Sequence, residues 1–161
     1  MIFTPCWELA EPVAVRSTRS GGDWRLCRAD NGGNTWYALD LPAIRSELRP
    51  LDFKILLNEI KVKMQRAEKG QLRLETLQNP GGEVEQTRAQ PLVLKMGFSA
   101  KMTPNLTRRH VRIYFTEPRH RARELLLLYI VSKADGRVGI KEQTQHIHLA
   151  CLRGHVDLSR S

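Results

Sequence analysis

The chain has 161 residues, of which 41% are hydrophobic and 27% charged, and its formal net charge is +9. This length fits one domain with a hydrophobic core of its own, and the composition excludes a wholly disordered chain. The longest apolar run, residues 125–131, is too short to cross a bilayer, and the N-terminus lacks the basic start and apolar run of a secretory signal. We therefore expect a soluble, cytoplasmic protein that makes no membrane contact.

The elements expected before residue 71 are short strands followed by helices. Residues 13–16 and 24–28 have strand character, and so do residues 36–41, which are aromatic and bounded by turn signals. A helical region follows, and Pro50 is expected to divide it into two helices. Gly70 is suited to end the second helix, whose apolar stripe has helical spacing. That stripe consists of Phe53, Leu57, Ile60, Met64 and Ala67.

The second half of the chain has the stronger strand pattern. Residues 71–90, around an Asn–Pro–Gly–Gly sequence, predict a hairpin or a polar loop. Alternating or continuous apolar residues then predict three strands and a final helix, at residues 92–97, 110–115, 124–132 and 140–153. On that helix the spacing places four residues on one side, namely Ile140, Thr144, Ile147 and Cys151.

This order of elements predicts an α+β fold. We expect a small, antiparallel, twisted sheet with the N-terminal helices packed on one face and a short C-terminal helix. The expected domain covers residues 34–156, after an extension at residues 1–33 that contains short strands and before a tail at residues 157–161. A helix pair on one face leaves the opposite face of the sheet open.

The positive charge is concentrated in the C-terminal part of the chain. Residues 1–94 carry 13 basic and 12 acidic residues, whereas residues 95–161 carry 13 basic and 5 acidic residues. Such a one-sided field attracts polyanions, so RNA, DNA or an acidic protein segment are the expected partners. A solvated surface that only keeps the protein soluble is the alternative interpretation.

Metal and disulfide sites are not indicated. The three cysteines, Cys6, Cys27 and Cys151, are odd in number and lack the close Cys or His spacing of a zinc site. We therefore expect reduced thiols, no metal and no cofactor.

Strand alternation predicts which basic side chains share the open face. If Val111, Ile113 and Phe115 point into the core, the residues between them point outward. Lys95 is expected on the same face of the preceding strand, and Lys133 at the end of the next strand. The cluster therefore consists of Lys95, His110, Arg112, Tyr114 and Lys133, with Arg108 and Arg109 beside it.

This set of residues suits cleavage of RNA through its 2′-hydroxyl. The reaction needs a base, an acid and cations that stabilise the charge on the phosphate, and it needs no metal. Arginine binds two phosphate oxygens at once, and histidine titrates near neutral pH. The alternative for each of these residues is a structural one: a solvated sheet face for Arg112, a surface position for His110 and a core position for Tyr114.

Residues 91–153 resemble the second half of the RelE/ParE-like bacterial toxins. The likeness is carried by Leu–Lys–Met at residues 94–96, by Val–Arg–Ile–Tyr–Phe at 111–115, and by the apolar strand that ends in Ser–Lys at 132–133. The resemblance implies that Lys95, Arg112 and Lys133 are active-site residues. Many of these nucleases place a tyrosine or histidine near the terminal helix, and here His146 and His148 are the available substitutes.

The resemblance implies the toxin of a type II toxin–antitoxin pair, a metal-independent endoribonuclease that cleaves mRNA, free or on the ribosome. It also implies an acidic antitoxin as the protein partner. The candidate catalytic residues are Arg112, Lys95, Lys133, His110 and His146. The candidate RNA-binding residues are Arg109, Arg108, Tyr114, Arg119 and Arg121.

Two alternatives to the nuclease remain open. A ParE-type member of the same family would inhibit DNA gyrase by binding, without nuclease chemistry. A non-catalytic module that binds nucleic acid or protein would keep only the fold.

Overall fold

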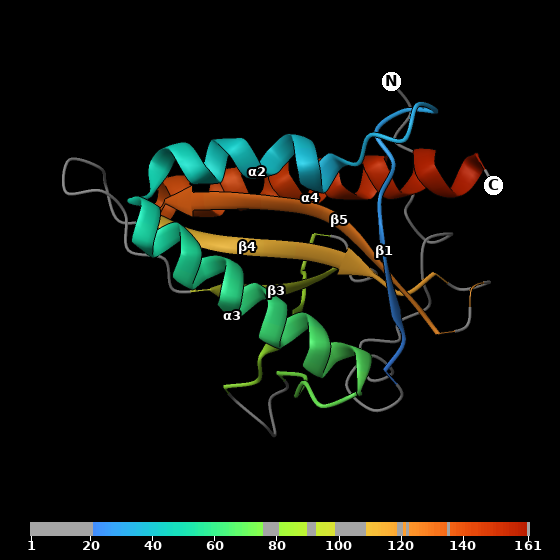
Figure 1. Cartoon of the computed structure of the whole chain (residues 1–161), viewed down its shortest axis with the longest axis horizontal. Coiled ribbons are helices and arrows are strands. Elements are labelled where there is room, and N and C mark those ends of the chain that lie inside the picture. Colours follow the sequence, from blue (N-terminus) through green and yellow to red (C-terminus); the bar gives the residue numbers. More distant parts are fainter. Residues whose placement is uncertain are drawn as a thin grey trace.

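The computed structural model describes residues 21–75, 81–89, 93–98, 109–118, 121, 123–134 and 136–160. Three helices and five strands lie in these ranges (Figure 1). In chain order they are β1 (Asp23–Leu26), α2 (Trp36–Glu47), α3 (Pro50–Glu68), β2 (Val84–Gln86), β3 (Leu94–Phe98), β4 (Arg109–Thr116), β5 (Glu124–Ala134) and α4 (Gly136–Ser159). The predicted α+β class is confirmed. The strand expected at residues 13–16 lies outside the described ranges.

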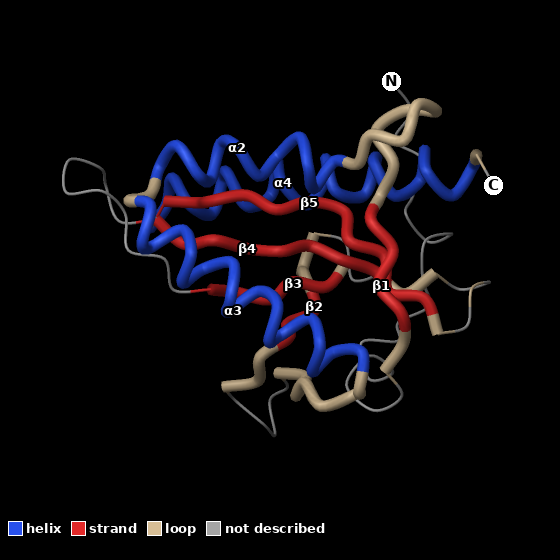
Figure 2. Tube along the Cα trace, viewed as in Figure 1, coloured by secondary structure: helices blue, strands red, loops and turns tan. Residues whose placement is uncertain are grey.

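The five strands form one mixed sheet in the order β1-β5-β4-β3-β2 (Figure 2). The β2–β3, β3–β4 and β4–β5 pairs are antiparallel, whereas β1 runs parallel to β5. The expectation of a purely antiparallel sheet was therefore wrong at β1. The segment expected as an N-terminal extension contributes this strand to the sheet, and its neighbour β5 lies about a hundred residues away in sequence. Such a long-range pairing leaves no local pattern in the sequence.

The strand expected at residues 36–41 is instead the first half of α2. Thr35 caps this helix, since its hydroxyl accepts a hydrogen bond from the Ala38 N–H at 3.3 Å. A helix cap and partial burial of Trp36 against α4 and the sheet outweigh the strand preference of the aromatic residues. Pro50 separates α2 from α3, as predicted, because it occupies the first turn of α3, where a missing N–H costs nothing.

Most of the predicted apolar stripe of α3 faces the core, but Leu57 is only half-buried and its neighbour Leu56 is the core residue instead. Ile60 and Ala67 are buried, and Phe53 and Met64 pack at the margin of the same cluster. The helix ends before Gly70, which has a φ of 68° and donates its N–H to the Ala67 carbonyl at 3.0 Å.

The sheet has a hydrophobic cluster on each face. On one face, α2 and α3 cover residues such as Met96, Ile113 and Phe115. On the other face, Ile147, Ala150 and Cys151 of α4 pack against Tyr114, Leu126 and Leu128. The expectation of an entirely open second face was therefore wrong, because α4 covers its β5 side.

The C-terminal helix is also longer than expected. It spans 24 residues, Gly136–Ser159, whereas the sequence predicted a helix at residues 140–153. Gly139 is buried against the Ala134 carbonyl, where a side chain would collide, so this glycine serves close packing rather than a turn. Ile147 and Cys151 face the sheet as expected, whereas Ile140 is 65% exposed and Thr144 is exposed as well. Cys151 is disulfide-bonded, so the expectation of reduced thiols was wrong at this residue.

Side chains from α4 close the outer edge of β5 beyond its short pairing with β1. That pairing ends at Leu127. Farther along, Arg153 donates to the Leu128 carbonyl at 3.3 Å, and Glu142 accepts from the Ala134 N–H at 3.1 Å. An edge protected in this way is a poor template for pairing with another strand. Within the described ranges no helix has the length and apolarity needed to span a membrane.

Candidate active site

Lys95 and Arg112 lie on the same face of the sheet. Lys95 is the Cα partner of Tyr114, and Gly97 is the Cα partner of Arg112. Because side chains alternate along a strand, residues 95 and 97 of β3 share a face with residues 112 and 114 of β4. The prediction that Lys95 and Arg112 lie on the same face of the sheet is confirmed.

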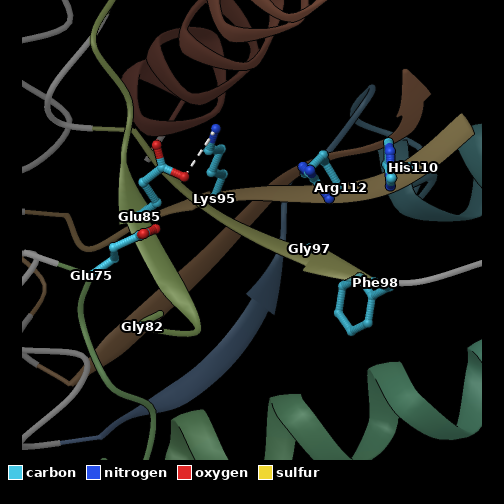
Figure 3. A pocket seen from close by; sticks show the side chains of 8 residues that line it. All are labelled: Glu75, Gly82, Glu85, Lys95, Gly97, Phe98, His110 and Arg112. Atoms are coloured by element: carbon cyan, nitrogen blue, oxygen red, sulfur yellow. Dashed lines mark ion pairs between the residues drawn. The ribbon is translucent and has the colours of Figure 1, made fainter. Parts of the chain in front are cut away.

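These cations line a pocket of about 330 Å³ on the part of this face formed by β2, β3 and β4. Its lining consists of Glu75, Gly82, Glu85, Lys95, Gly97, Phe98, His110 and Arg112. Figure 3 shows Lys95 and Glu85 turned toward each other, with Arg112 and His110 farther along β4 and the Phe98 ring pointing toward the helix below. Three of the five predicted catalytic residues, namely Lys95, His110 and Arg112, therefore meet in one pocket.

Lys95 is held by an ion pair that the sequence did not indicate. Its Nζ lies 3.2 Å from Oε2 of Glu85, which is its Cα partner on β2. The Lys95 side chain is 12% exposed and that of Glu85 is 46% exposed, so the pair stands at the mouth of the pocket. Partial burial strengthens such a pair relative to one in bulk water.

Glu75 and Glu85 bring carboxylates into a site for which the sequence predicted none. Residues 71–90 had been interpreted as a hairpin or polar loop, without a register against β3. The alternation of Val84, which is buried, with Glu85, which is half-buried, was the available signal for a strand.

Arg112 lies across Gly97. A Cβ on Gly97 would be 3.1 Å from the guanidinium carbon of Arg112 and closer still to Nη1. The guanidinium therefore occupies the space that a side chain at residue 97 would fill. Its Nη1 also lies 3.4 Å from the Val111 carbonyl.

Two of the predicted catalytic residues lie outside the pocket. Lys133 is the Cα partner of His110, but its Nζ lies against the first turn of α4, 3.6 Å from the Cβ position of Gly139. His146 contacts the ring of Tyr129 edge-on, with 5.6 Å between ring centroids, and lines a separate groove between α2, β5 and α4. The structure does not bring His146 to the pocket lined by Lys95, His110 and Arg112.

Tyr114 shares the face of the pocket but is fully buried beneath α4. Its expected exposure was wrong, because the long C-terminal helix covers this part of β4. Burial raises the pKa of the Tyr114 hydroxyl above its ordinary value, so the group stays protonated near neutral pH. A side chain without exposed surface cannot contact RNA.

The remaining basic candidates are placed as follows. Arg121 pairs with Glu124 at 3.4 Å, at the end of the β4–β5 hairpin opposite to His110. Arg109 belongs to β4 through its backbone, and nothing is described of its side chain. Arg108 and Arg119 lie outside the described residues.

The described residues contain no group of three or more histidine, cysteine, aspartate or glutamate side chains that could hold a metal ion. Comparisons with known proteins give no match: neither a family model, nor a curated protein, nor a solved structure is significantly similar to this chain. The likeness to RelE/ParE toxins therefore rests on the residue pattern alone.

Proposed function

We propose that this protein is an endoribonuclease that cleaves RNA by attack of a 2′-hydroxyl on the adjacent phosphodiester. One observation carries the proposal: the strand register brings Lys95, Arg112, His110 and Glu85 into one pocket of about 330 Å³. This set contains a carboxylate, an imidazole and two cations. Those are the groups that the reaction needs, and it consumes no cofactor.

Each of these side chains has its own role in the reaction. Glu85 accepts the proton of the 2′-hydroxyl, and the 2′-oxygen forms a bond to phosphorus. The bond from phosphorus to the 5′-oxygen breaks, and His110 donates a proton to that oxygen. The products are a 2′,3′-cyclic phosphate and a free 5′-hydroxyl. Arg112 and Lys95 stabilise the negative charge that collects on the phosphate oxygens in the transition state.

The ion pair between Lys95 and Glu85 supports the roles of Glu85 as the base and Lys95 as a phosphate-binding cation. It holds the carboxylate beside the cation that would bind the phosphate, at 3.2 Å between Oε2 and Nζ. A base held next to the phosphate site is close to the 2′-oxygen that must attack.

We further propose that the protein is the toxin of a type II toxin–antitoxin pair in the cytoplasm, with mRNA, free or on the ribosome, as its substrate. The resemblance of residues 91–153 to RelE/ParE-like toxins supports this role, and so does the excess of basic residues after residue 94. An acidic antitoxin would neutralise this positive charge, and its own charge would favour rapid association.

The test uses purified protein with a short single-stranded RNA and with ribosomes loaded with mRNA. Arg112→Ala should lower the cleavage rate by roughly 100- to 1000-fold, the loss expected for a group that stabilises transition-state charge. Glu85→Gln should lower it by about 100-fold or more, as for a general base. Arg45→Ala is the matched control, because Arg45 is exposed on α2, over the other face of the sheet.

Wild-type protein that cleaves neither substrate would overturn the nuclease proposal, and an Arg112→Ala variant as active as the wild type would overturn the role assigned to Arg112 in this pocket. The same variants expressed in cells separate the alternatives. Growth arrest with broken chromosomes and intact transcripts would favour a gyrase inhibitor, and unimpaired growth would favour a non-catalytic module.

A further inference from the structure

The space above Gly97 determines where the Arg112 guanidinium can lie. Gly97 is the Cα partner of Arg112, and its missing side chain leaves a shallow slot on the pocket face of β3. The guanidinium fills this slot: its Nε lies 3.6 Å and its central carbon 3.1 Å from the position that a Cβ would take.

A second contact holds this stretch of β3 from the side of α3. Lys63 donates from Nζ to the Gly97 carbonyl at 2.6 Å, and the same ammonium lies 4.8 Å from the centroid of the Phe98 ring. The β2–β3 pairing ends at Met96, so this carbonyl lies beyond the part of β3 that β2 covers. Burial lowers the pKa of Lys63, and the charge of Arg112 is among the smaller contributions in the same direction, so the two cations lie within electrostatic range of each other.

We propose that Gly97 is the positioning residue of the nuclease pocket: its bare Cα seats the Arg112 guanidinium over β3, and Lys63 fixes the strand beneath it. The inference rests on the proposed function, in which Arg112 stabilises the charge on the phosphate. It adds a residue with no reactive group of its own, which acts through Arg112.

A methyl group at Gly97 should disturb function without disturbing the fold. To regain van der Waals distance from a new Cβ, Nη1 of Arg112 must move by about 1 Å. The obstructing atoms are the far end of a flexible side chain, so the shift costs little stability, and alanine suits a strand better than glycine does. A displacement of about 1 Å at a reacting group can lower a rate by as much as about 100-fold.

The experiment is a double-mutant cycle with Gly97→Ala and Arg112→Ala, measured on whichever substrate the wild type cleaves. Gly97→Ala should lower kcat by about tenfold or more, with little change in KM, because the displaced group acts on the transition state. The Gly97→Ala/Arg112→Ala double variant should be no slower than Arg112→Ala alone. The melting temperature of Gly97→Ala should equal or exceed that of the wild type.

A direct readout does not depend on activity. The NMR signal of the Arg112 Nε–H, assigned by its loss in Arg112→Lys, should shift in Gly97→Ala, and the signal of the exposed Arg45 should not. Lys63→Met is a second variant, which should also shift the Arg112 signal, because it removes the hydrogen bond to the Gly97 carbonyl.

The outcomes separate the two proposals. An inactive Arg112→Ala beside a fully active Gly97→Ala, with the NMR signal unmoved, would refute the positioning role and leave the nuclease intact. If Gly97→Ala lowers kcat further in the Arg112→Ala background, the positioning role would also be refuted, because the effect would then not pass through Arg112. A fully active Arg112→Ala would refute the role of Arg112 in the pocket and the positioning role of Gly97 with it, whereas a wild type that cleaves no RNA would refute the nuclease proposal.

Discussion

Replacing Arg153 by methionine should destabilise the protein far more than the loss of an ordinary surface cation. Arg153 is 7% exposed, and its guanidinium lies between the rings of Trp36 and Tyr129, at 4.0 and 4.2 Å from their centroids. Nη1 and Nη2 bind the two carboxylate oxygens of Asp40 at 2.6 and 3.1 Å. This side chain therefore joins α4 to α2, and it also closes the edge of β5 at Leu128.

The expected loss follows from what the substitution leaves behind. Methionine fills much of the space but leaves the Asp40 carboxylate, which is 14% exposed, without its partner. Breaking a buried pair in this way costs about 3–5 kcal/mol. For a chain of this size, that corresponds to a fall in melting temperature of roughly 6–20 °C.

The matched control is Arg49→Met. Arg49 also pairs with an aspartate at 2.6 Å, but its side chain is 56% exposed, and such a pair is worth at most about 1 kcal/mol. Both variants are compared with the wild type by urea unfolding and thermal melting. A loss in Arg153→Met no larger than that in Arg49→Met would refute the reasoning.

The loss in Arg153→Met should also depend on pH. Burial already raises the pKa of Asp40 above its ordinary value in spite of Arg153, and without Arg153 the pKa should rise further. A group whose pKa is raised in the folded state destabilises the protein when it is ionised, so the penalty should shrink as the pH falls. Asp40→Asn in the same background should recover part of the stability at neutral pH.

Two further predictions concern the last turn of α4 and the neighbouring β1 segment. Burial alone would raise the pKa of Asp157, but hydrogen bonds from Arg25 and Arg28 outweigh it and hold the pKa below its ordinary value. Asp157 should therefore stabilise the fold fully at neutral pH, and this stabilisation should be lost as the pH falls below about 4. Asp157→Asn should flatten this part of the curve of melting temperature against pH. A curve that Asp157→Asn leaves unchanged would contradict the assignment. Burial raises the pKa of the Cys27 thiol to about 12. At about pH 8, iodoacetamide should label the Cys27 peptide in unfolded but not in native protein, as measured by mass spectrometry, and rapid native labelling would contradict this.

The face shared by Lys95 and Arg112 could be predicted from the sequence because strand alternation is a local signal. Apolar Leu94, Met96 and Ile113 point to one side, so the residues between them point to the other, and the antiparallel β3–β4 pair aligns them. This argument needs only two neighbouring strands.

The parts that the sequence did not predict depend on longer-range contacts. Glu85 enters the pocket only because the three-residue strand β2 pairs with β3 in one register, and residues 71–90 carry too few apolar side chains to specify it. The cover over Tyr114 depends on the packing of Ile147, Ala150 and Cys151 against this part of the sheet, which is a tertiary contact without a local sequence pattern. The slot at Gly97 likewise exists only in the register that places it opposite Arg112.

The chemistry of the cut ends tests the central claim most directly. If Glu85, His110 and Arg112 cleave RNA through the 2′-hydroxyl, the fragments should carry a 2′,3′-cyclic phosphate and a 5′-hydroxyl, and a single 2′-deoxy substitution at the cleaved nucleotide should abolish the cut. Fragments with a 3′-hydroxyl and a 5′-phosphate, or continued cleavage at the 2′-deoxy position, would contradict the account.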